Sequence, residues 1–371
     1  MKLPIWSWSI IALFIVGGGV HYLTLNTLEQ MTGQMIITGF NGHKVHKNSD
    51  DFLEISEQIN HGDIGGVILF DKNISNTKRL RKMTKHLSSI APQKLLIAID
   101  QEGGAVQRLK PGHGFVPTPS AKFLGQTDSE NTYSVAYDLG TCLMELGINV
   151  NFAPVIDIDI NPESPAIGAY GRSFSSDPHT VAQHGGAFAR GLSDAGMAYS
   201  FKHFPGHGSA RADSHIGLTD VTETYHDDEM IPWRELITDA TPTTMVMVAH
   251  IVNKNIDDVP ASLSKKHIQM LRDMGFDGVI VSDDMDMGAI VKEYGMRDAI
   301  KMAINAGNDI LVFGNNLRFN PKRGREVNAI IVDLVRSGEI PESRIRESYR
   351  RIMRLKQNIG RKIKRSKNDD K

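Results

Sequence analysis

Cysteine is almost absent from this chain. The 371 residues include one cysteine, Cys142, so no disulfide can form within the chain and no site can be built from several thiolates. The apolar run around it, residues 139–146, predicts that Cys142 is a buried residue of a helix. With 40% hydrophobic and 23% charged residues, the composition is that of an ordinary globular protein held together by its core.

An excess of charge of one sign is also missing. There are 42 Lys and Arg residues against 43 Asp and Glu residues, which gives a formal net charge of −1. A near-neutral chain gives no reason to expect a nucleic acid as partner. The charges are also unevenly spread, because residues 361–371 hold six basic residues. We expect this basic tail to be a solvated end of the chain.

The N-terminal segment lacks charge altogether beyond its second residue. After Lys2 there is no Asp, Glu, Lys or Arg before Glu29, and Ile5–Val20 is nearly all apolar. This pattern predicts a signal anchor, and thus a transmembrane segment, or a cleaved signal peptide over residues 1–28. A buried first helix of the domain is the alternative. Either membrane interpretation places the rest of the chain outside the cytoplasm, membrane-anchored or secreted.

A structural pattern repeats eight times in residues 29–360. Apolar, β-branched runs alternate with longer stretches of helical periodicity, which predicts parallel strands joined by helices. Eight such units predict an α/β fold, a single-domain (β/α)8 TIM-type barrel, with an open doubly wound sheet as the alternative. The predicted strands are Met35–Gly39, Gly66–Phe70, Leu95–Asp100, Asn149–Ala153, Ala198–His203, Thr244–His250, Gly278–Ser282 and Ile310–Phe313. The predicted helices are Asn76–Ser89, Glu130–Leu146, Pro178–Ala195, Lys265–Met274, Met296–Ala306 and Pro341–Ile359.

Polar side chains follow the ends of several predicted strands. The third strand ends at Asp100, the fourth leads to Asp157, the fifth ends in Lys202 and His203, the sixth ends at His250, and the seventh is followed by Asp283 and Asp284. In a barrel, the carboxyl ends of all strands meet at one mouth. The sequence therefore predicts one polar site at that mouth.

The loop after the fifth strand is the most unusual segment. It reads K-H-F-P-G-H-G-S-A-R-A-D-S-H from Lys202 to His215. Asp213 and His215 are two residues apart, a spacing at which a carboxylate can hydrogen-bond an imidazole and fix its tautomer. We expect Gly206 and Gly208, together with the small residues Ala210 and Ala212, to let this loop swing.

Taken together, these motifs resemble family 3 of the glycoside hydrolases, and in particular its single-domain β-N-acetylglucosaminidase (β-hexosaminidase) branch. The matching segments, in chain order, are D-Q-E-G-G-A-V-Q-R at 100–108, N-F-A-P-V-I-D at 151–157, G-R-S-F at 171–174, the 202–215 loop, H-I at 250–251, P-A-S-L-S at 260–264 and V-S-D-D-M-D-M at 281–287. The resemblance extends from about residue 33 to residue 360.

The resemblance implies a retaining, exo-acting glycosidase that removes β-linked N-acetylglucosamine, without metal or cofactor. It implies that Asp283 is the nucleophile and that His215, paired with Asp213, is the acid and base. A cell-wall muropeptide is the expected substrate, and a bacterial periplasm or exterior the expected location. The positions that match sugar-binding residues of the family are Asp100, Arg108, Arg172, Lys202, His203 and His250.

Other functions remain open from the sequence. The same scaffold could serve a β-glucosidase or a glycoside phosphorylase. A metal-dependent barrel hydrolase would use His203, His207, Asp213 and His250, since imidazole and carboxylate suit zinc. A non-catalytic, membrane-tethered glycan-binding protein is the third alternative, although binding alone does not need an Asp–His pair and a second aspartate.

Overall fold

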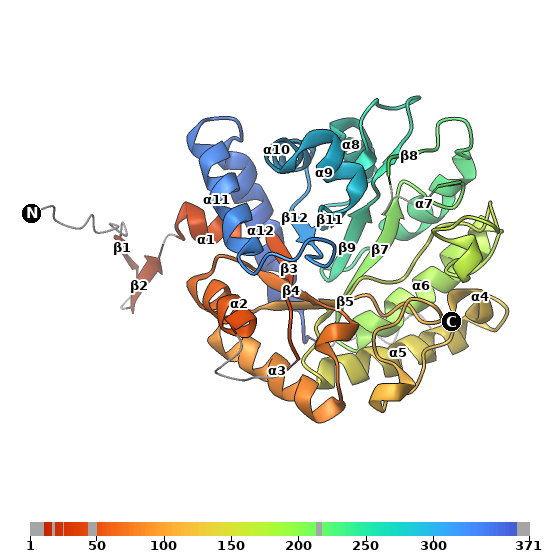
Figure 1. Cartoon of the computed structure of the whole chain (residues 1–371), viewed down its shortest axis with the longest axis horizontal. Coiled ribbons are helices and arrows are strands. Elements are labelled where there is room, and N and C mark those ends of the chain that lie inside the picture. Colours follow the sequence, from red (N-terminus) through yellow and green to blue (C-terminus); the bar gives the residue numbers. More distant parts are fainter. Residues whose placement is uncertain (1–10, 17–18, 25, 44–49, 213–216, 362–371) are drawn as a thin grey trace, which may run out of the picture.

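Eight parallel strands close into a barrel at the centre of the molecule (Figure 1). The structure is a computed structural model that describes residues 11–16, 19–24, 26–43, 50–212 and 217–361. Around the barrel the strand order is β11-β12-β3-β4-β5-β6-β7-β9, and β9 pairs with β11 to close the ring. The strands are β3 (Ile36–Gly39), β4 (Gly66–Leu69), β5 (Leu96–Ile99), β6 (Val150–Asn151), β7 (Ala198–Phe204), β9 (Thr244–Val248), β11 (Val279–Asp284) and β12 (Ile310–Phe313).

The eight predicted strands and the barrel prediction are confirmed. Each strand is buried along its length, apart from the last two residues of β11. Parallel strands covered by helices on one side and filled by side chains on the other read as continuous apolar runs, which is why they could be found in the sequence. The strand residues that are only partly buried are Asp283 and Asp284, which lie where β11 opens into the mouth; the polar Lys202 and His203 of β7 are buried.

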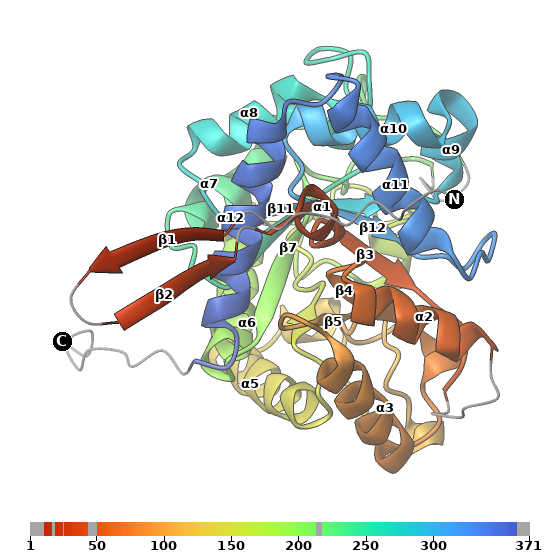
Figure 2. The ribbon, with the colours of Figure 1, turned by 90° about the vertical axis from the view of Figure 1, so that its left-hand side faces the viewer.

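Helices surround the barrel (Figures 1 and 2). Side-chain caps mark where several of them begin: Asn76 accepts from the backbone N–H of Arg79, and Ser264 accepts from that of His267. The predicted helices are confirmed, with ends that shift by one or two residues. The helices are α1 (Leu28–Gly33), α2 (Asp50–His61), α3 (Thr77–Ile90), α4 (Ala121–Leu124), α5 (Ser129–Glu145), α6 (Pro178–Asp194), α7 (Ile231–Ile237), α8 (Lys265–Asp273), α9 (Gly288–Tyr294), α10 (Met296–Ala306), α11 (Arg323–Arg336) and α12 (Glu342–Asn358).

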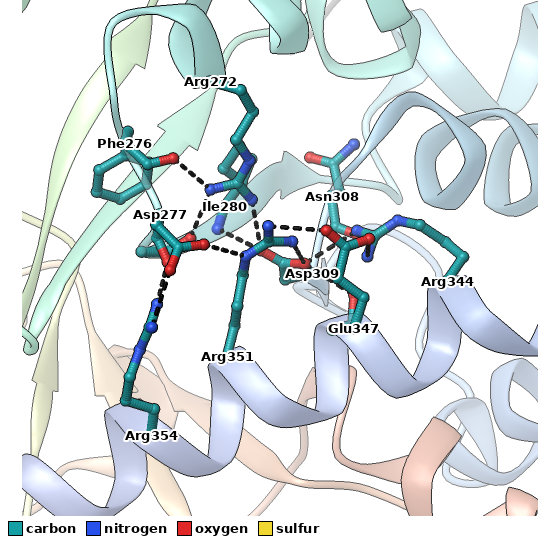
Figure 3. A network of polar contacts seen from close by, with 12 residues as sticks. Arg272, Phe276, Asp277, Ile280, Asn308, Asp309, Arg344, Glu347, Arg351 and Arg354 are labelled. Atoms are coloured by element: carbon teal, nitrogen blue, oxygen red, sulfur yellow. Dashed lines mark hydrogen bonds and ion pairs between the residues drawn. The ribbon is translucent and has the colours of Figure 1, made fainter.

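Helix α12 is fixed to the amino-terminal ends of the strands by buried charges. Figure 3 shows Arg272, Arg344 and Arg351 converging on Asp309, the residue before β12. Farther along the helix, the buried ammonium of Lys356 donates to the side chain of Gln34 and, at 2.9 Å, to the carbonyl of Gly65. Helix α12 thus covers one end of the barrel. The opposite end, where the strands end, is available for a site.

The prediction for residues 1–28 is not supported by the described part of that segment. There the structure has a two-stranded antiparallel sheet, β1 (Ile11–Val16) and β2 (Gly19–Thr24), outside the barrel in Figure 2, followed by the start of α1. Among the residues described, we find no helix that combines the length and apolarity needed to span a membrane.

The burial predicted for Cys142 is wrong. The residue lies in α5, as expected, but it is exposed. The buried residues of this helix, Thr132, Ala136, Gly140 and Leu143, are spaced by four, four and three positions and so form one face. Cys142 falls beside this face because neighbouring residues of a helix point about 100° apart.

A short parallel pair that the sequence did not predict lies near the barrel mouth. Strand β8 (Thr219–Asp220) pairs with β10 (Ile251–Val252), just after β9. The backbone N–H of Val221 also donates to the carbonyl of Val252 at 2.8 Å. This pair ties the chain that follows the 202–215 loop to the segment that carries His250.

Candidate active site

The carboxyl ends of the strands surround a small cleft. The polar residues that line it come from β7, from β11 and from the loops after β5, β6 and β7. Its volume is about 200 Å³. The charged and polar residues of its lining are Asp100, Glu102, Arg108, Arg172, Lys202, His203, His207, Asp283 and Asp284. Of the predicted site residues, the structure therefore brings Asp100, Arg108, Arg172, Lys202, His203 and Asp283 together.

Four of these residues form a buried ion network. The Nζ of Lys202 lies 2.9 Å from Oδ1 of Asp100 and 2.7 Å from Oε1 of Glu102. Arg172 donates to Glu102 twice, from Nε to Oε2 at 2.8 Å and from Nη2 to Oε1 at 2.7 Å. A planar guanidinium matches a carboxylate in this two-bond geometry, so the arginine is held in one orientation.

The network keeps its members charged despite their burial. Burial opposes the charge of Glu102, but Arg172 and Lys202 hold the pKa of its carboxyl well below its usual range. Burial likewise opposes the charge of Lys202, and Asp100 and Glu102 raise its pKa above the usual value. Near neutral pH the cleft therefore presents an ammonium and a guanidinium as donors, and carboxylate oxygens as acceptors.

Arg108 completes the side of the cleft near Asp100. Its Nη2 lies 3.7 Å from Oδ2 of Asp100, and its guanidinium lies 5.7 Å from the ring centroid of Phe70. The backbone N–H of Arg108 donates to Oε1 of Gln101 at 2.8 Å, which fixes the loop after β5. The guanidinium of Arg108 thus packs on the ring of Phe70, and the residue lines the cleft.

Asp157 orients two histidines. It is buried, and its Oδ2 accepts from Nδ1 of His203 at 2.7 Å, while its Oδ1 accepts from the backbone N–H of His207 at 2.8 Å. Nδ1 of His203 therefore carries a proton, and its Nε2 faces Nη2 of Arg172 at 3.4 Å. Burial disfavours the charge of Asp157, but His203 and His207 lower its pKa below the usual value.

His207 is a neutral ring at physiological pH. Burial lowers its pKa to about 4, and the neighbouring His203 acts in the same sense. The two rings meet edge to face, with centroids 5.7 Å apart. A neutral, buried imidazole suits packing and hydrogen bonding better than proton donation near pH 7.

Asp283 and Asp284 lie side by side at the end of β11 but in different surroundings. Oδ1 of Asp283 accepts from the backbone N–H of Asp284 at 2.7 Å. Oδ1 of Asp284 accepts from the N–H groups of Gly314, at 2.7 Å, and Asp286, at 3.0 Å. Burial raises the pKa of Asp284 to about 7, and the charges of Asp286 and Asp283 add to this rise. Asp284 therefore holds neighbouring backbone in place.

His250 does not fit the predicted contact with sugar. It is fully buried, with Nδ1 2.6 Å from Oγ of Ser262 and Nε2 3.0 Å from the carbonyl oxygen of Asp284. A carbonyl can only accept, so Nε2 carries the proton and Nδ1 accepts from the serine hydroxyl. Both ring nitrogens are thus hydrogen-bonded within the protein, and the bond to the Asp284 carbonyl supports the end of β11.

The glycines of the loop after β7 serve close packing, so the predicted swing does not begin at them. Gly206 has φ +143°, and a Cβ atom there would lie 2.7 Å from the Cβ of Glu229. A Cβ atom on Gly208 would lie 1.8 Å from the carbonyl oxygen of Ile158. Ala210 is fully buried. The described start of the loop is thus tightly packed up to Ala210.

Asp213 and His215, the predicted acid and base pair, lie outside the described residues. The chain leading to them is exposed at Arg211 and Ala212. Their assignment therefore still rests on the sequence motif.

Sequence reasoning missed two buried carboxyl groups. Asp157 was noted only as a polar residue after the fourth strand, although it organises His203 and His207. Glu229 was not noted at all, yet it accepts from the N–H of Gly208 at 2.8 Å. Asp157 ends the N-F-A-P-V-I-D motif at 151–157, but no local pattern marks Glu229.

A metal centre is not preformed in the described part of the chain. There we find no group of three or more His, Cys, Asp or Glu side chains arranged to hold a metal ion. Of the histidines considered for zinc, His203 is bonded to Asp157, and His250 is bonded to Ser262 and Asp284.

Comparisons with known proteins match most of this chain to one family. Residues 27–355 match the family described as the glycosyl hydrolase family 3 N terminal domain. A β-hexosaminidase A from Pseudoalteromonas piscicida is 34% identical over 89% of this chain, and a β-hexosaminidase from Tolumonas auensis is 38% identical over 71% of it. The chain spans 61% of the first relative's length and 79% of the second's.

Solved structures of glycosidases share the fold of this chain. A family 3 β-N-acetylglucosaminidase from Paenibacillus sp. superposes with a TM-score of 0.82 at 36% identity, covering 93% of this chain and 66% of that one. A β-N-acetylhexosaminidase from Beutenbergia cavernae superposes with a TM-score of 0.80 at 28% identity, covering 90% of this chain and 99% of that one. This chain belongs to glycosyl hydrolase family 3.

Proposed function

We propose that the chain is a retaining, exo-acting glycoside hydrolase that removes terminal β-linked N-acetylglucosamine. One observation carries the proposal: Asp283, at the end of β11, lines the same small cleft as the ion network of Asp100, Glu102, Arg172 and Lys202. A carboxylate beside a set of fixed donors and acceptors is what glycoside hydrolysis requires. The names of the relatives, β-hexosaminidase and β-N-acetylglucosaminidase, support the choice of sugar.

Asp283 is the proposed nucleophile. A carboxylate oxygen attacks the anomeric carbon as the glycosidic C–O bond breaks, and the leaving oxygen takes a proton from His215. The product is a glycosyl ester on Asp283 and a free aglycone alcohol. In the second step His215, held by Asp213, removes a proton from water, and the resulting oxygen attacks the anomeric carbon and frees Asp283. Two inversions give net retention.

The ion network is the proposed clamp for the sugar. A hydroxyl both donates and accepts, so it can bind between the Lys202 ammonium and an Asp100 oxygen. Arg108, Arg172 and His203 line the same cleft and add further polar edges. We assign His250 to support of the β11 terminus instead of sugar contact, because it is buried behind Asp284.

The size of the cleft supports removal of single terminal sugars. Its volume of about 200 Å³ is below the roughly 300–1,000 Å³ of pockets that enclose larger ligands. One sugar ring fits a cleft of this kind better than a stretch of glycan chain. Cell-wall muropeptide fragments are the proposed natural substrates.

An extracytoplasmic location is proposed on the sequence of residues 5–20 alone. Cells that express the full chain can be separated into membrane, periplasmic and cytoplasmic fractions. Activity confined to the cytoplasmic fraction would contradict this part of the proposal without touching the chemistry.

A panel of 4-nitrophenyl β-glycosides tests the activity. We expect turnover of the N-acetylglucosaminide, much slower turnover of the glucoside, and no dependence on a chelator. Assays with and without phosphate separate hydrolysis from phosphorolysis, because phosphorolysis yields a sugar 1-phosphate. No release of nitrophenol from any glycoside would reject the proposed function.

A further inference from the structure

A second cavity lies between the loop after β5, helix α3 and helix α5. Its volume is about 660 Å³, and it shares no lining residue with the cleft. We propose that this cavity is a binding site for a small organic cation with an apolar body. The inference concerns a ligand other than the sugar substrate, so it does not depend on the proposed function.

The walls of the cavity are largely apolar. The apolar residues of the lining include Leu109, Phe115, Pro117, Val135, Leu139 and Leu146. The volume falls within the roughly 300–1,000 Å³ of pockets that enclose small organic ligands, and such pockets are lined mainly by apolar side chains. Apolar atoms of a ligand would leave water when they enter this cavity, which favours binding.

The loop that forms one wall is fixed at both ends. The fully buried Gln101 lies in the lining, and its Oε1 accepts from the backbone N–H groups of Arg108, at 2.8 Å, and Leu109, at 3.0 Å. At the other end of the loop, the backbone N–H of Thr118 donates to Oε1 of Gln107 at 3.2 Å. The cavity is therefore preformed, and binding requires little ordering of the loop.

The charges of the lining favour a positive ligand. Arg81 and Glu145 pair with each other, with Nη2 and Oε2 3.6 Å apart, and Nε of Arg81 also donates to the carbonyl of Glu145 at 3.1 Å. The remaining charged residue of the lining is Asp138, an exposed residue of α5. In the part of the chain that the structure describes, Asp138 has no ion-pair partner. An ammonium group would complement this carboxylate.

Cys142 can report whether the cavity is occupied. It lines the cavity, it is exposed, and it is the single cysteine of the chain. Partial burial, together with the charge of Glu145, raises the pKa of its thiol above the usual value. Alkylation should therefore be measured at about pH 8.5–9, where more thiolate is present. A ligand in the cavity would shield the thiol, so the alkylation rate reports occupancy without an assay of glycosidase activity.

The experiment measures how three probes slow the alkylation of Cys142 by iodoacetamide in the full chain. The probes are 4-phenylbutylamine, 4-phenylbutanol and 4-phenylbutanoate, which share an apolar body and differ in charge. For a cation of this size we expect half-maximal protection near roughly 1 mM. The alcohol should bind about 3-fold more weakly and the carboxylate more weakly still, because an exposed charge pair contributes modestly.

Asp138→Asn removes the charge that distinguishes the probes. It should bring the amine and the alcohol to nearly equal protection and leave the protection by the alcohol unchanged. Asp298→Asn is the matched control, because it makes the same change at an exposed residue of α10. It should leave the order of the three probes as it is in the unmodified protein.

Three results would overturn the inference. The first is that none of the probes slows alkylation. The second is that the amine and the carboxylate protect Cys142 equally. The third is that Asp298→Asn reduces the advantage of the amine as much as Asp138→Asn does, because the charge effect would then not arise in the cavity.

Discussion

Arg172 and Glu102 face each other in a two-bond pair, with Nε to Oε2 at 2.8 Å and Nη2 to Oε1 at 2.7 Å. The pair joins the loop after β6 to the loop after β5 and is almost fully buried. Glu102 also accepts from Lys202, so one carboxylate holds two cations of the cleft. The position of both donors toward a sugar therefore depends on this carboxylate.

Replacing Glu102 with Ala should damage both stability and binding. It leaves two buried cations without their shared partner, and breaking a buried pair in this way costs about 3–5 kcal/mol. Urea unfolding should report the loss, and KM for an aryl N-acetylglucosaminide should rise. Glu339→Ala is the control, because it breaks exposed pairs with Arg297 and Lys301 and should change either quantity far less. Equal effects of the two variants would contradict the importance of burial.

Asp309 should be a stability residue without a catalytic role. It is fully buried, and Arg272 and Arg344 each lie 2.9 Å from it (Figure 3). Asp309→Asn removes the charge that these arginines share, so the unfolding free energy should fall by about 3–5 kcal/mol. The fraction that remains folded should keep its kcat, because Asp309 lies at the amino-terminal end of β12. A loss of kcat at unchanged stability would contradict this assignment.

Lys356 should make stability depend on pH in the alkaline range. Burial lowers its pKa from 10.5 to about 7, so the unfolded chain binds its proton more tightly than the folded chain does. Stability should therefore rise as the pH increases from about 7 toward 10.5, and below about 7 the cost of the buried charge is fully present. Lys356→Met should flatten this part of the curve of unfolding temperature against pH. An unchanged slope would show that the lysine is not the group that titrates.

His215→Ala tests the proposed acid directly. Without a proton donor, glycosides with alkyl leaving groups should lose roughly 100- to 10,000-fold in kcat/KM. Activated aryl glycosides, whose leaving groups need little protonation, should lose much less by the same measure. Equal losses on both would remove His215 from the role of acid.

Most of the fold could be predicted from the sequence because buried parallel strands appear in it as short, continuous apolar runs. Strands such as β5 and β12 are apolar throughout, and the polar residues that follow the strands fall at one end of the barrel. The small β8–β10 pair could not be predicted, since each strand has two residues and depends on a contact between distant segments.

Site residues that belong to a dense sequence motif could be predicted. Residues whose role depends on packing could not. Asp100, Arg172 and Lys202 meet in the cleft as expected. The glycines of the loop were misinterpreted as hinges, because a sequence does not show that Gly206 packs on Glu229 and Gly208 on the backbone of Ile158. For the same reason the sequence could not decide between sugar contact and a buried hydrogen bond for His250, as a histidine after a strand can face the cleft or the core.

The identity of the nucleophile is tested most directly by trapping the covalent intermediate. A fluorinated N-acetylglucosaminide with an activated leaving group slows the second step more than the first, so the glycosyl-enzyme accumulates. We expect mass spectrometry of the digested protein to find one sugar attached to Asp283, and none in Asp283→Ala. A sugar found on another residue, or an active enzyme that forms no adduct and releases an inverted product, would contradict the account.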